Sequence, residues 1–486
     1  MTRAMRRAKI VCTIGPASCD SAMLDRLIEA GMNVARLNFS HGTQAGHAAM
    51  LDAIRAAADR RRTAVAILQD LQGPRIRLGV LPQIGYELVA EQRVRLVGGL
   101  LRSGGQLGAQ TVLGSTLLEL PVTYPQLARD VRPGARILID DGRIELLVSS
   151  VSGGAVECRV VTGGRVTSQK GMNLPGTVVS APTLTDKDRD DIRFGIAHQV
   201  DYLALSFVRG PEDLLAARDF VRSCGGDQPI VAKIERAEAI ESLGAILDMS
   251  DGVMIARGDL GVEMGPEAVP VLQKRIIAEA NRRRRVVITA TQMLESMMTQ
   301  PVPTRAEASD VANAIFDGTD AVMLSGETAR GRYPVETVRV MDRIVCAAEA
   351  ERRLTATAVR PHGQTETIAE AMCGAAAAAA ETTGAAALAV MTESGMTARL
   401  LSKHQPAAPI VAFTPQEATR RRMALYWGVS PHVMTWRHNP DEQVTELERR
   451  LKSEHAAVSG DRIVLLAGTV AGRPGGTNVM KLHALE

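Results

Sequence analysis

Three charged residues in the middle of the chain lie where two short apolar runs end. Lys233 and Glu235 stand at the end of the run 229–234, and Asp259 follows the run 251–256, with a helical pattern between the two runs. Strand, helix and strand in this order favour a parallel pair, whose carboxyl ends lie side by side. Glu235 and Asp259 can then share one hard cation, most simply Mg²⁺, with water and substrate oxygens completing its shell. Lys233 would stand beside them as a cation aimed at an anionic substrate.

Eight apolar runs of this kind alternate with helical patterns, which predicts a (β/α)₈ TIM barrel rather than an open sheet. Active sites of such barrels lie at the carboxyl ends of the strands. The alternative is that the polar residues there are solvated charges, turns or caps, and this is the simplest interpretation of Ser325. The runs are 9–14, 34–39, 64–69, 201–207, 230–235, 252–256, 286–291 and 321–324. Their carboxyl ends carry Asn38, Ser40, Asp70, Ser206, Lys233, Glu235, Asp259, Thr291 and Ser325.

Composition narrows the class of protein. The chain has 486 residues, enough for two or three domains. A net charge of +3 and an aromatic content of 3% disfavour a general nucleic-acid binder, although a local phosphate pocket is compatible with them. The six cysteines have no CxxC or zinc-type spacing, which indicates free thiols in a reduced compartment. No apolar run is long enough for a membrane span or a secretory signal, so we expect a cytoplasmic protein without membrane partners.

The barrel pattern is interrupted once. Residues 75–174 are rich in valine, glycine and short alternating runs, which predicts a small all-β domain, a β-barrel inserted as a lid at the barrel mouth. Asp140-Asp141-Gly142 is typical of a hairpin turn. Lys170 precedes the return to the barrel, and it is either a phosphate contact of the closed lid or a surface lysine.

The last part of the chain, 354–486, again alternates strands and helices and predicts a separate α/β domain. The barrel then comprises 1–74 and 175–353. Within the last domain, the loop 392–397 joins a strand to the start of a helix. Its backbone amides and hydroxyls fit an anion site, but an ordinary Ser/Thr N-cap explains the same pattern.

Several motifs taken together resemble pyruvate kinase, from about residue 8 to the end of the chain. The resemblance implies the same order of barrel, lid, barrel and C-terminal domain. It also implies a phosphotransferase of glycolysis that transfers the phosphoryl group of phosphoenolpyruvate to ADP, giving pyruvate and ATP, with Mg²⁺ or Mn²⁺ as cofactor. The motifs are AKIVCTIGPAS, MNVARLNFSHG, ILIDDG, KGMNLPG, KIE, ARGDLG, ATQMLESM, PTRAEASDVANAIFDGTDAVMLSGETA and GTN.

The resemblance also implies a role for each matching residue. Glu235 and Asp259 resemble the metal ligands, and Lys233 resembles the lysine that bridges the phosphoryl group and the developing enolate. Arg36 would contact the transferring phosphate, and Thr291 would help to relay a proton whose donor stays open. Substrate binding falls to Arg36, Lys233, Ala256, Arg257, Gly258, Asp259 and Thr291, and the nucleotide side to Asn38, His41, Arg77 and Lys170.

One motif departs from the K⁺-dependent pattern of the family, DTKGPEIR. The chain reads DLQGPRIR over 70–77, with Leu71 at the threonine position and Arg75 at the glutamate position. Members with lysine in place of that glutamate are associated with independence from K⁺, and arginine keeps the fixed positive charge. We therefore expect no K⁺ requirement. Asn38, Ser40 and Asp70 still match the K⁺ ligands. Asp70 could instead pair with Arg75, and Arg75 could also point into solvent.

The C-terminal loop resembles the effector loop of the family, with Met396 where related loops often carry Arg or Lys. We expect activation by a sugar or nucleotide monophosphate rather than strong control by fructose 1,6-bisphosphate. The family is typically homotetrameric. The candidate effector residues are Thr392, Ser394, Gly395, Thr397 and Arg473.

Two rival functions deserve comparison. A metal-dependent barrel lyase of the aldolase type explains Glu235 and Asp259, but it does not explain the lid or the nucleotide-side residues. A non-catalytic barrel scaffold with a sensing domain predicts damaged catalytic positions, yet Lys233, Arg36 and Thr291 are present. Glu307, in T-x-x-E, fits a structural capping box better than a catalytic role.

Overall fold

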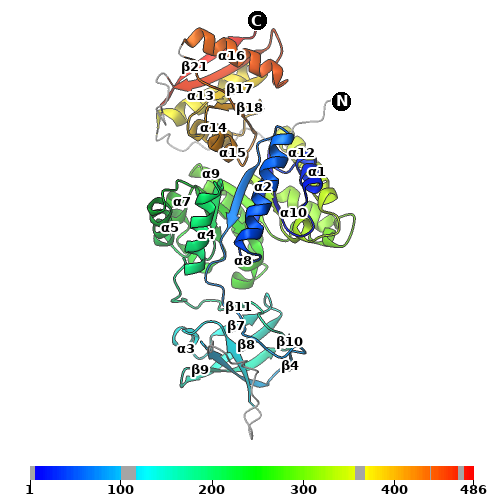
Figure 1. Ribbon diagram of the computed structural model, residues 1–486, viewed down its shortest axis with the longest axis vertical. Coiled ribbons are helices and arrows are strands. Elements are labelled where there is room, and N and C mark those ends of the chain that lie inside the picture. Colours follow the sequence, from blue (N-terminus) through cyan, green and yellow to red (C-terminus); the bar gives the residue numbers. More distant parts are fainter. Residues whose placement is uncertain (1–5, 100–116, 356–366, 438, 469–475) are drawn as a thin grey trace.

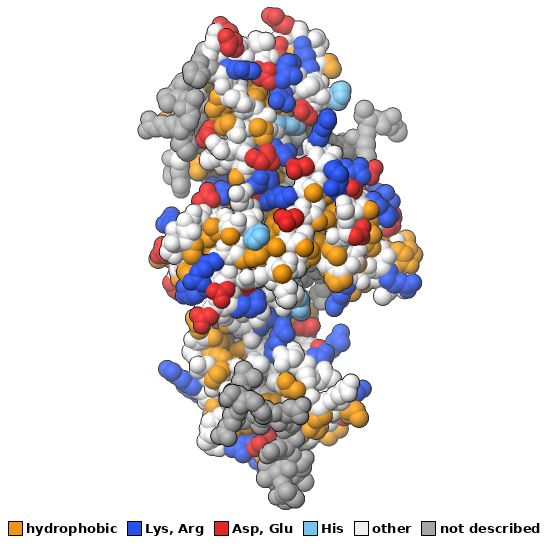
Figure 2. Space-filling view, viewed as in Figure 1, with side chains coloured by type: hydrophobic (Ala, Val, Ile, Leu, Met, Phe, Trp, Pro, Cys, Tyr) orange, Lys and Arg blue, Asp and Glu red, His pale blue; other side chains and the backbone are white. Residues whose placement is uncertain are grey.

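The molecule has three parts that follow one another along its long axis (Figure 1). The computed structural model describes residues 6–99, 117–355, 367–437, 439–468 and 476–486. A barrel lies in the middle, with an all-β lid at one end and an α/β domain at the other. Basic and acidic side chains are mixed over the face seen in Figure 2, in keeping with the small net charge. In the described ranges, no helix is long and apolar enough to span a membrane.

The central barrel confirms the predicted (β/α)₈ fold. Its eight parallel strands close in the order β1-β16-β15-β14-β13-β12-β3-β2. Most of their residues are buried, as expected when both faces of a parallel sheet are covered. The strands are β1 (Lys9–Thr13), β2 (Val34–Asn38), β3 (Ala66–Asp70), β12 (Tyr202–Leu205), β13 (Ile230–Ile234), β14 (Gly252–Ala256), β15 (Val286–Ala290) and β16 (Ala321–Leu324).

The helices around the barrel follow the sequence patterns with one difference. The stretch 236–247, predicted as one helix, forms two short helices, because Ser242 between them takes up φ −92° and ψ 11°. The capping box predicted at Thr304 and Glu307 is present. The helices are α1 (Ser21–Ala30), α2 (Gln44–Arg60), α4 (Asp186–Ala197), α5 (Pro211–Ser223), α6 (Ala237–Glu241), α7 (Leu243–Met249), α8 (Arg257–Met264), α9 (Val269–Arg282), η1 (Glu295–Met298), α10 (Arg305–Asp317), α11 (Gly326–Ala329) and α12 (Pro334–Thr355).

The lid is all-β, and its main sheet has six strands in the order β11-β7-β8-β9-β5-β6. Its two edges meet at one short segment, because Arg77 bridges Gly171 beside β11 and Leu78 bridges Val122 of β6. The turn predicted at 140–142 joins β7 to β8, with positive φ at all three residues. The elements are β4 (Tyr86–Leu88), β5 (Arg93–Gly98), β6 (Leu118–Val122), α3 (Leu127–Asp130), β7 (Arg136–Ile139), β8 (Ile144–Ser152), β9 (Ala155–Thr162), β10 (Gly164–Val166) and β11 (Met172–Asn173).

The C-terminal domain is a five-stranded sheet in the order β19-β18-β17-β20-β21, parallel except for β21. The alanine-rich helix α13 begins with a capping box at Thr367 and Glu370. The elements are α13 (Ile368–Thr383), β17 (Ala387–Met391), α14 (Met396–Ser402), β18 (Ile410–Thr414), α15 (Glu417–Met423), β19 (Val429–Val433), α16 (Pro440–Ser453), β20 (Arg462–Gly468) and β21 (Thr477–Ala484).

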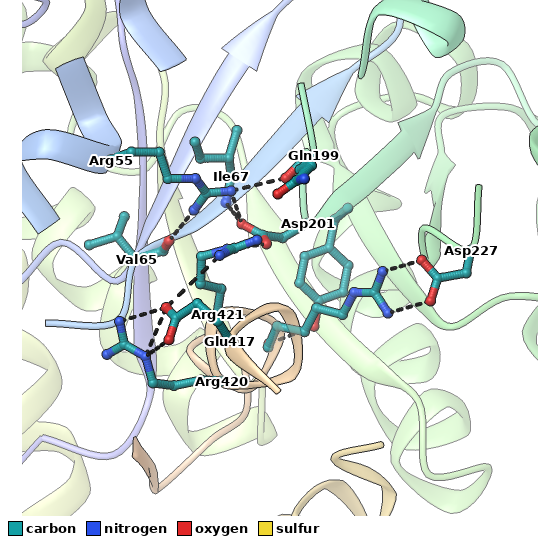
Figure 3. A network of polar contacts seen from close by, with 11 residues as sticks. Arg55, Val65, Ile67, Gln199, Asp201, Asp227, Glu417, Arg420 and Arg421 are labelled. Carbon is teal, nitrogen blue, oxygen red and sulfur yellow. Dashed lines mark hydrogen bonds and ion pairs between the residues drawn. The ribbon is translucent and has the colours of Figure 1, made fainter. Parts of the chain in front are cut away.

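The amino ends of the barrel strands face this C-terminal domain. Asp201, just before β12, is buried and accepts hydrogen bonds from Arg55 at 2.8 Å, from the Ile67 amide at 2.7 Å and from Arg421 of α15 at 2.9 Å (Figure 3). The Tyr202 hydroxyl donates to the Arg422 carbonyl at 2.7 Å. These contacts attach the C-terminal domain to one end of the barrel and leave the opposite end, with the carboxyl ends of the strands, facing the lid (Figure 1).

Candidate active site

Lys233 of β13 is the centre of a buried charge cluster at the lid-facing end of the barrel. Its ammonium donates to the Ser206 hydroxyl at 2.7 Å and pairs with Glu235 at 2.7 Å and with Asp70 at 3.3 Å. Burial alone would lower the pKa of Lys233, but the carboxylates of Asp70 and Glu235 outweigh it and raise that pKa above its ordinary value. The site therefore holds a lysine that keeps its proton.

Arg36 of β2 joins the cluster through Asp70 of the neighbouring strand β3. Two guanidinium nitrogens of Arg36 contact the same Asp70 oxygen at 2.7 and 2.6 Å, and Nη1 donates to the Thr13 hydroxyl at 2.9 Å. Burial would raise the pKa of Asp70, but Lys233 and Arg36 together lower it. The pairing of Asp70 with Arg75 considered from the sequence is therefore wrong. Asp70 binds Arg36 of the adjacent strand β2 and Lys233 of β13, which lies beyond β12 in the barrel.

Glu235 and Asp259 are neighbours in this cluster with unequal partners. Glu235 accepts the Phe207 amide at 3.0 Å as well as contacting Lys233. Asp259 lies in the first turn of α8, and no hydrogen-bond donor of the described residues contacts its carboxylate. Burial, followed by the negative charge of Glu235, raises the pKa of Asp259 to about 6. Two nearby carboxylates, of which Asp259 has no donor among the described residues, fit a hard divalent cation.

The two carboxylates do not form a complete metal site by themselves. Within the described ranges, no group of three or more His, Cys, Asp or Glu side chains is arranged to hold a metal ion. A cation held by Glu235 and Asp259 would therefore take its remaining ligands from water or substrate, as the sequence suggested.

Thr291 lies directly after β15 and contacts the start of α8. Its hydroxyl accepts the Gly258 amide at 2.8 Å and donates to the Ala290 carbonyl at 2.7 Å. The Gly258 amide, expected to bind a substrate carboxylate, thus donates to Thr291 in this structure. Between these residues and the lid hairpin lies a cleft of about 880 Å³, whose lining includes Asp141 and Gly142 of the lid.

The residues expected on the nucleotide side fall into two groups. Asn38 ends β2 and accepts the Ser40 amide at 3.1 Å. Burial, with the positive charges of Arg75 and Arg77, lowers the pKa of His41, so these cations lie close to it. Lys170 belongs to the lid: its carbonyl accepts the Leu78 amide at 2.9 Å, and its ammonium pairs with Asp140 at 2.7 Å. The structure thus brings Lys170 beside Arg77 and leaves it half-exposed on the lid.

Two family models match this chain. The model described as "Pyruvate kinase, barrel domain" matches residues 5–338, and the model described as "Pyruvate kinase, alpha/beta domain" matches residues 370–483. The chain belongs to the pyruvate kinase family. Pyruvate kinase of Staphylococcus saprophyticus is 45% identical to it, over 99% of this chain and 80% of the relative. Pyruvate kinase of Sporosarcina psychrophila is 44% identical, over 99% of this chain and 81% of the relative. The chain is therefore an enzyme of the phosphotransferase class.

Three residues of the motif that is associated with K⁺, namely Asp70, Leu71 and Arg75, lie in different surroundings. Asp70 is bound by Arg36 and Lys233, and Leu71 is buried. Arg75 is exposed, yet its charge acts to lower the pKa of Asp259 and of His41. The replacement of a monovalent cation by Arg75 stays a prediction.

The candidate effector loop already uses two of its hydroxyls. Thr392 accepts the Gly395 amide at 3.0 Å, and the Thr397 hydroxyl lies 2.5 Å from the Thr477 hydroxyl. Gly395 takes up φ +79°, which a residue with a Cβ seldom adopts. Ser394 belongs to the same loop, and Arg473 lies outside the described residues.

Sequence reasoning missed two groups in this pyruvate kinase site: Thr13 binds Arg36, and the Phe207 amide binds Glu235. Arg257 was named only for substrate binding, and its side chain binds the loop after β15. Thr13 lies one residue before the end of the first predicted strand, so the strand-end rule that selected the other polar residues could have found it. The positive φ of Phe207, +58°, has no signal in the sequence, because a non-glycine residue gives no local reason to adopt it.

Proposed function

We propose that the chain transfers the phosphoryl group of phosphoenolpyruvate to ADP, giving pyruvate and ATP, with Mg²⁺ or Mn²⁺ at Glu235 and Asp259. The observation that carries the proposal is the placement of Lys233 between Ser206, Asp70 and Glu235, beside Arg36. Phosphoryl transfer depends on positioning and on cations where oxygen atoms accumulate charge. This cluster supplies two cations, Arg36 of β2 and Lys233 of β13, at the same end of the barrel.

The residues of the chain divide the work as follows. Arg36, oriented by Asp70 and Thr13, binds the transferring phosphate. Lys233 keeps its proton and stabilises the negative charge shared by the phosphoryl group and the enolate oxygen. The divalent cation, when bound, supplies Lewis-acid stabilisation of the same charge. Thr291 helps to pass a proton to the enolate carbon. The amides of Gly258 and Asp259 bind the substrate carboxylate, for which the Gly258 amide exchanges its present acceptor, the Thr291 hydroxyl.

A coupled assay of ATP formation from phosphoenolpyruvate and ADP tests this function. The expected result is turnover that stops on chelation of divalent cations and returns with Mg²⁺ or Mn²⁺. Cleavage of an aldol substrate without ATP formation would favour the aldolase-type lyase instead. The absence of both reactions would favour the non-catalytic scaffold.

Independence from K⁺ is part of the proposal and depends on Arg75. Its charge acts on Asp259 and His41, so it can take the place of a monovalent cation at the mouth of the site. We expect near-full activity in K⁺-free buffer with tetramethylammonium. Arg75→Lys keeps the charge and should stay independent, whereas Arg75→Glu should be slow without K⁺ and partly restored by it. A parent enzyme that is inactive until K⁺ is added would refute this part.

Regulation is assigned to the loop that contains Thr392, Ser394, Gly395 and Thr397, with Arg473 nearby in sequence. A phosphorylated metabolite, a sugar or nucleotide monophosphate, would bind there and raise activity. The double substitution Thr392→Ala with Ser394→Ala should bring the activated rate down to the unactivated one. Tight activation by fructose 1,6-bisphosphate would contradict the preference for a monophosphate.

The domain assignment completes the proposal. Residues 1–74 and 175–353 form the catalytic barrel, 75–174 the lid and 354–486 the regulatory domain of a cytoplasmic homotetramer. Light scattering of the purified protein at working concentration tests the assembly, and a monomer or dimer would exclude it.

A further inference from the structure

The turn after β15 has an unusual backbone. Thr291 and Gln292 follow one another with φ +67° and +53°. This left-handed region is sparsely populated by residues other than glycine, and least of all by β-branched ones such as threonine. Such a conformation persists only where surrounding contacts enforce it, and it is frequent at functional sites. The question is what enforces it here.

Arg257 makes the contacts that hold this turn. Its Nη2 donates to the Thr291 carbonyl at 2.7 Å and to the Gln292 carbonyl at 3.3 Å. Its Nε donates to the Ala290 carbonyl at 3.2 Å and to the Thr291 carbonyl at 3.3 Å. One guanidinium therefore binds three successive carbonyls through Nε and Nη2 alone and keeps Nη1 for other partners, which the three donors of a single ammonium cannot match.

The guanidinium is itself oriented from the opposite side. Nη1 of Arg257 donates to Asp310 of α10 at 2.7 Å and to Gln273 of α9 at 3.2 Å. Gln273 is held in turn by a hydrogen bond to Asp317 at 3.0 Å. The arginine is buried, so its geometry is set by these contacts rather than by solvent.

Arg257 also stands at a junction between two parts of the site. It is the first residue of α8, and Gly258 and Asp259 come directly after it. The Gly258 amide donates to the Thr291 hydroxyl at 2.8 Å. The backbone of Arg257 thus leads into the candidate metal and carboxylate site, while its side chain fixes the turn that carries Thr291.

We propose that Arg257 is a positioning residue, whose guanidinium holds the left-handed turn 291–292 so that the Thr291 hydroxyl stays in register with Gly258 and Asp259. This inference rests on the proposed function. It acts on the proton-transfer half of the reaction, because Thr291 is the group that Arg257 places. Arg257 itself touches no reacting atom.

The test separates positioning from a merely structural role. Arg257→Lys keeps the charge but loses the fork, so we expect kcat to fall by about ten- to a hundredfold, the scale for misplacing a catalytic group by about 1 Å. Exchange of pyruvate methyl hydrogens in D₂O, followed by NMR, reports the proton-transfer half alone, and it should fall by a similar factor. The KM for ADP should stay unchanged.

A double-mutant cycle decides the question. If Arg257 acts through Thr291, Arg257→Lys should have no further effect on hydrogen exchange in a Thr291→Val background. The proposal would be overturned if the double variant lost exchange by the product of the two single-variant factors. An exchange rate in Arg257→Lys equal to that of the parent would overturn it as well. If Arg257→Lys melts far below the parent, Asp310→Asn replaces it in the cycle. This substitution removes only the negative charge that orients Nη1 of Arg257 and leaves the contacts of the guanidinium with the turn 291–292. If the parent itself forms no ATP and exchanges no hydrogen, the proposed function is refuted, and the inference about Arg257 falls with it. If the parent is active, the results for the variants test the inference alone.

Discussion

Carboxylates lie at both ends of the barrel, and they differ in how far the chain itself neutralises them. At the amino end, Asp320 accepts the Val287 amide at 2.7 Å and pairs with Lys403 of the C-terminal domain, while Asp201 has three donors. At the carboxyl end, Asp259 has a raised pKa and no donor among the described residues. A carboxylate whose partners are all supplied by the chain stabilises the fold, and one that lacks them can bind a ligand.

Two buried lysines allow this comparison to be tested with the same substitution. Lys403 contacts Asp320 and Asn281 at the junction with the C-terminal domain, and Lys233 contacts Asp70 and Glu235 at the lid-facing end. If the two ends differ as described, Lys→Met should damage stability at one and catalysis at the other.

Lys403→Met should have the largest effect. The side chains of Lys403 and Asp320 are only 2% and 1% exposed. Removing the ammonium leaves Asp320 as an uncompensated buried charge, so the free energy of unfolding should fall by about 3–5 kcal/mol. Urea unfolding measures it, and kcat of the folded protein should stay close to that of the parent. A stable variant with low kcat would reverse the comparison.

Lys233→Met should lower kcat by about 10²–10³, the scale for losing one preorganised electrostatic group. The physical reason is the loss of the positive charge at the site where the enolate and phosphoryl oxygens gain negative charge. Steady-state assays measure it, with the KM for ADP changing much less. Near-normal turnover would remove Lys233 from the mechanism.

Glu235→Gln and Asp259→Asn should each raise the Mg²⁺ concentration needed for half-activation by at least about tenfold, a loss seen even for residues that only support metal ligands. Both changes remove an anionic oxygen from a hard cation. A titration of activity with Mg²⁺ measures the shift, and Asp201→Asn at the opposite end is the control. Parent-like titrations of both variants would place the metal elsewhere.

Lys9→Met should have the smallest effect, and it depends on pH. Lys9 is buried at the amino end and donates to the Val429 carbonyl at 2.7 Å. Burial, with the charge of Arg6, lowers its pKa from 10.5 to about 7. Between these values the unfolded chain binds the proton and the folded one does not, so this group stabilises the fold more as pH rises.

The measurement is the melting temperature of the parent minus that of Lys9→Met, compared at pH 7 and pH 9. This difference should increase with pH, because only the parent carries the titrating ammonium. A difference that stays constant or decreases would show that the pKa of Lys9 is not lowered in the folded protein.

Much of the fold followed from apolar patterns, because buried parallel strands need continuous apolar runs whatever their partners are. The convergence of Asp70, Lys233 and Glu235 also followed, since the carboxyl ends of parallel strands share one end of the barrel, whereas Arg36 was named only through the family resemblance. The pairing within the cluster did not. Asp70 binds Arg36 and Lys233 rather than Arg75, and that choice depends on strand register, which the sequence pattern leaves undetermined.

The backbone conformation of the site was still harder to predict from the sequence. The positive φ of Thr291 and Gln292 is enforced by Arg257, which lies two helices and one strand earlier in the chain. The break at Ser242 has one local signal, Gly244 two residues later, and an isolated glycine does not by itself end a helix. Local sequence predicts local preference, and these residues depart from it because tertiary hydrogen bonds outweigh that preference.

The short segment that joins the edges of the lid sheet also constrains how the lid is mounted. The two chain segments between barrel and lid are hydrogen-bonded to each other, from the Leu78 amide to the Lys170 carbonyl and from the Met172 amide to the Ile76 carbonyl, both at 2.9 Å. They form a two-stranded ribbon rather than two independent tethers. A ribbon bends easily out of its plane but resists shear along it, because shear breaks the ladder. We therefore expect the lid to rotate relative to the barrel by bending of this ribbon out of its plane, and not by sliding along it.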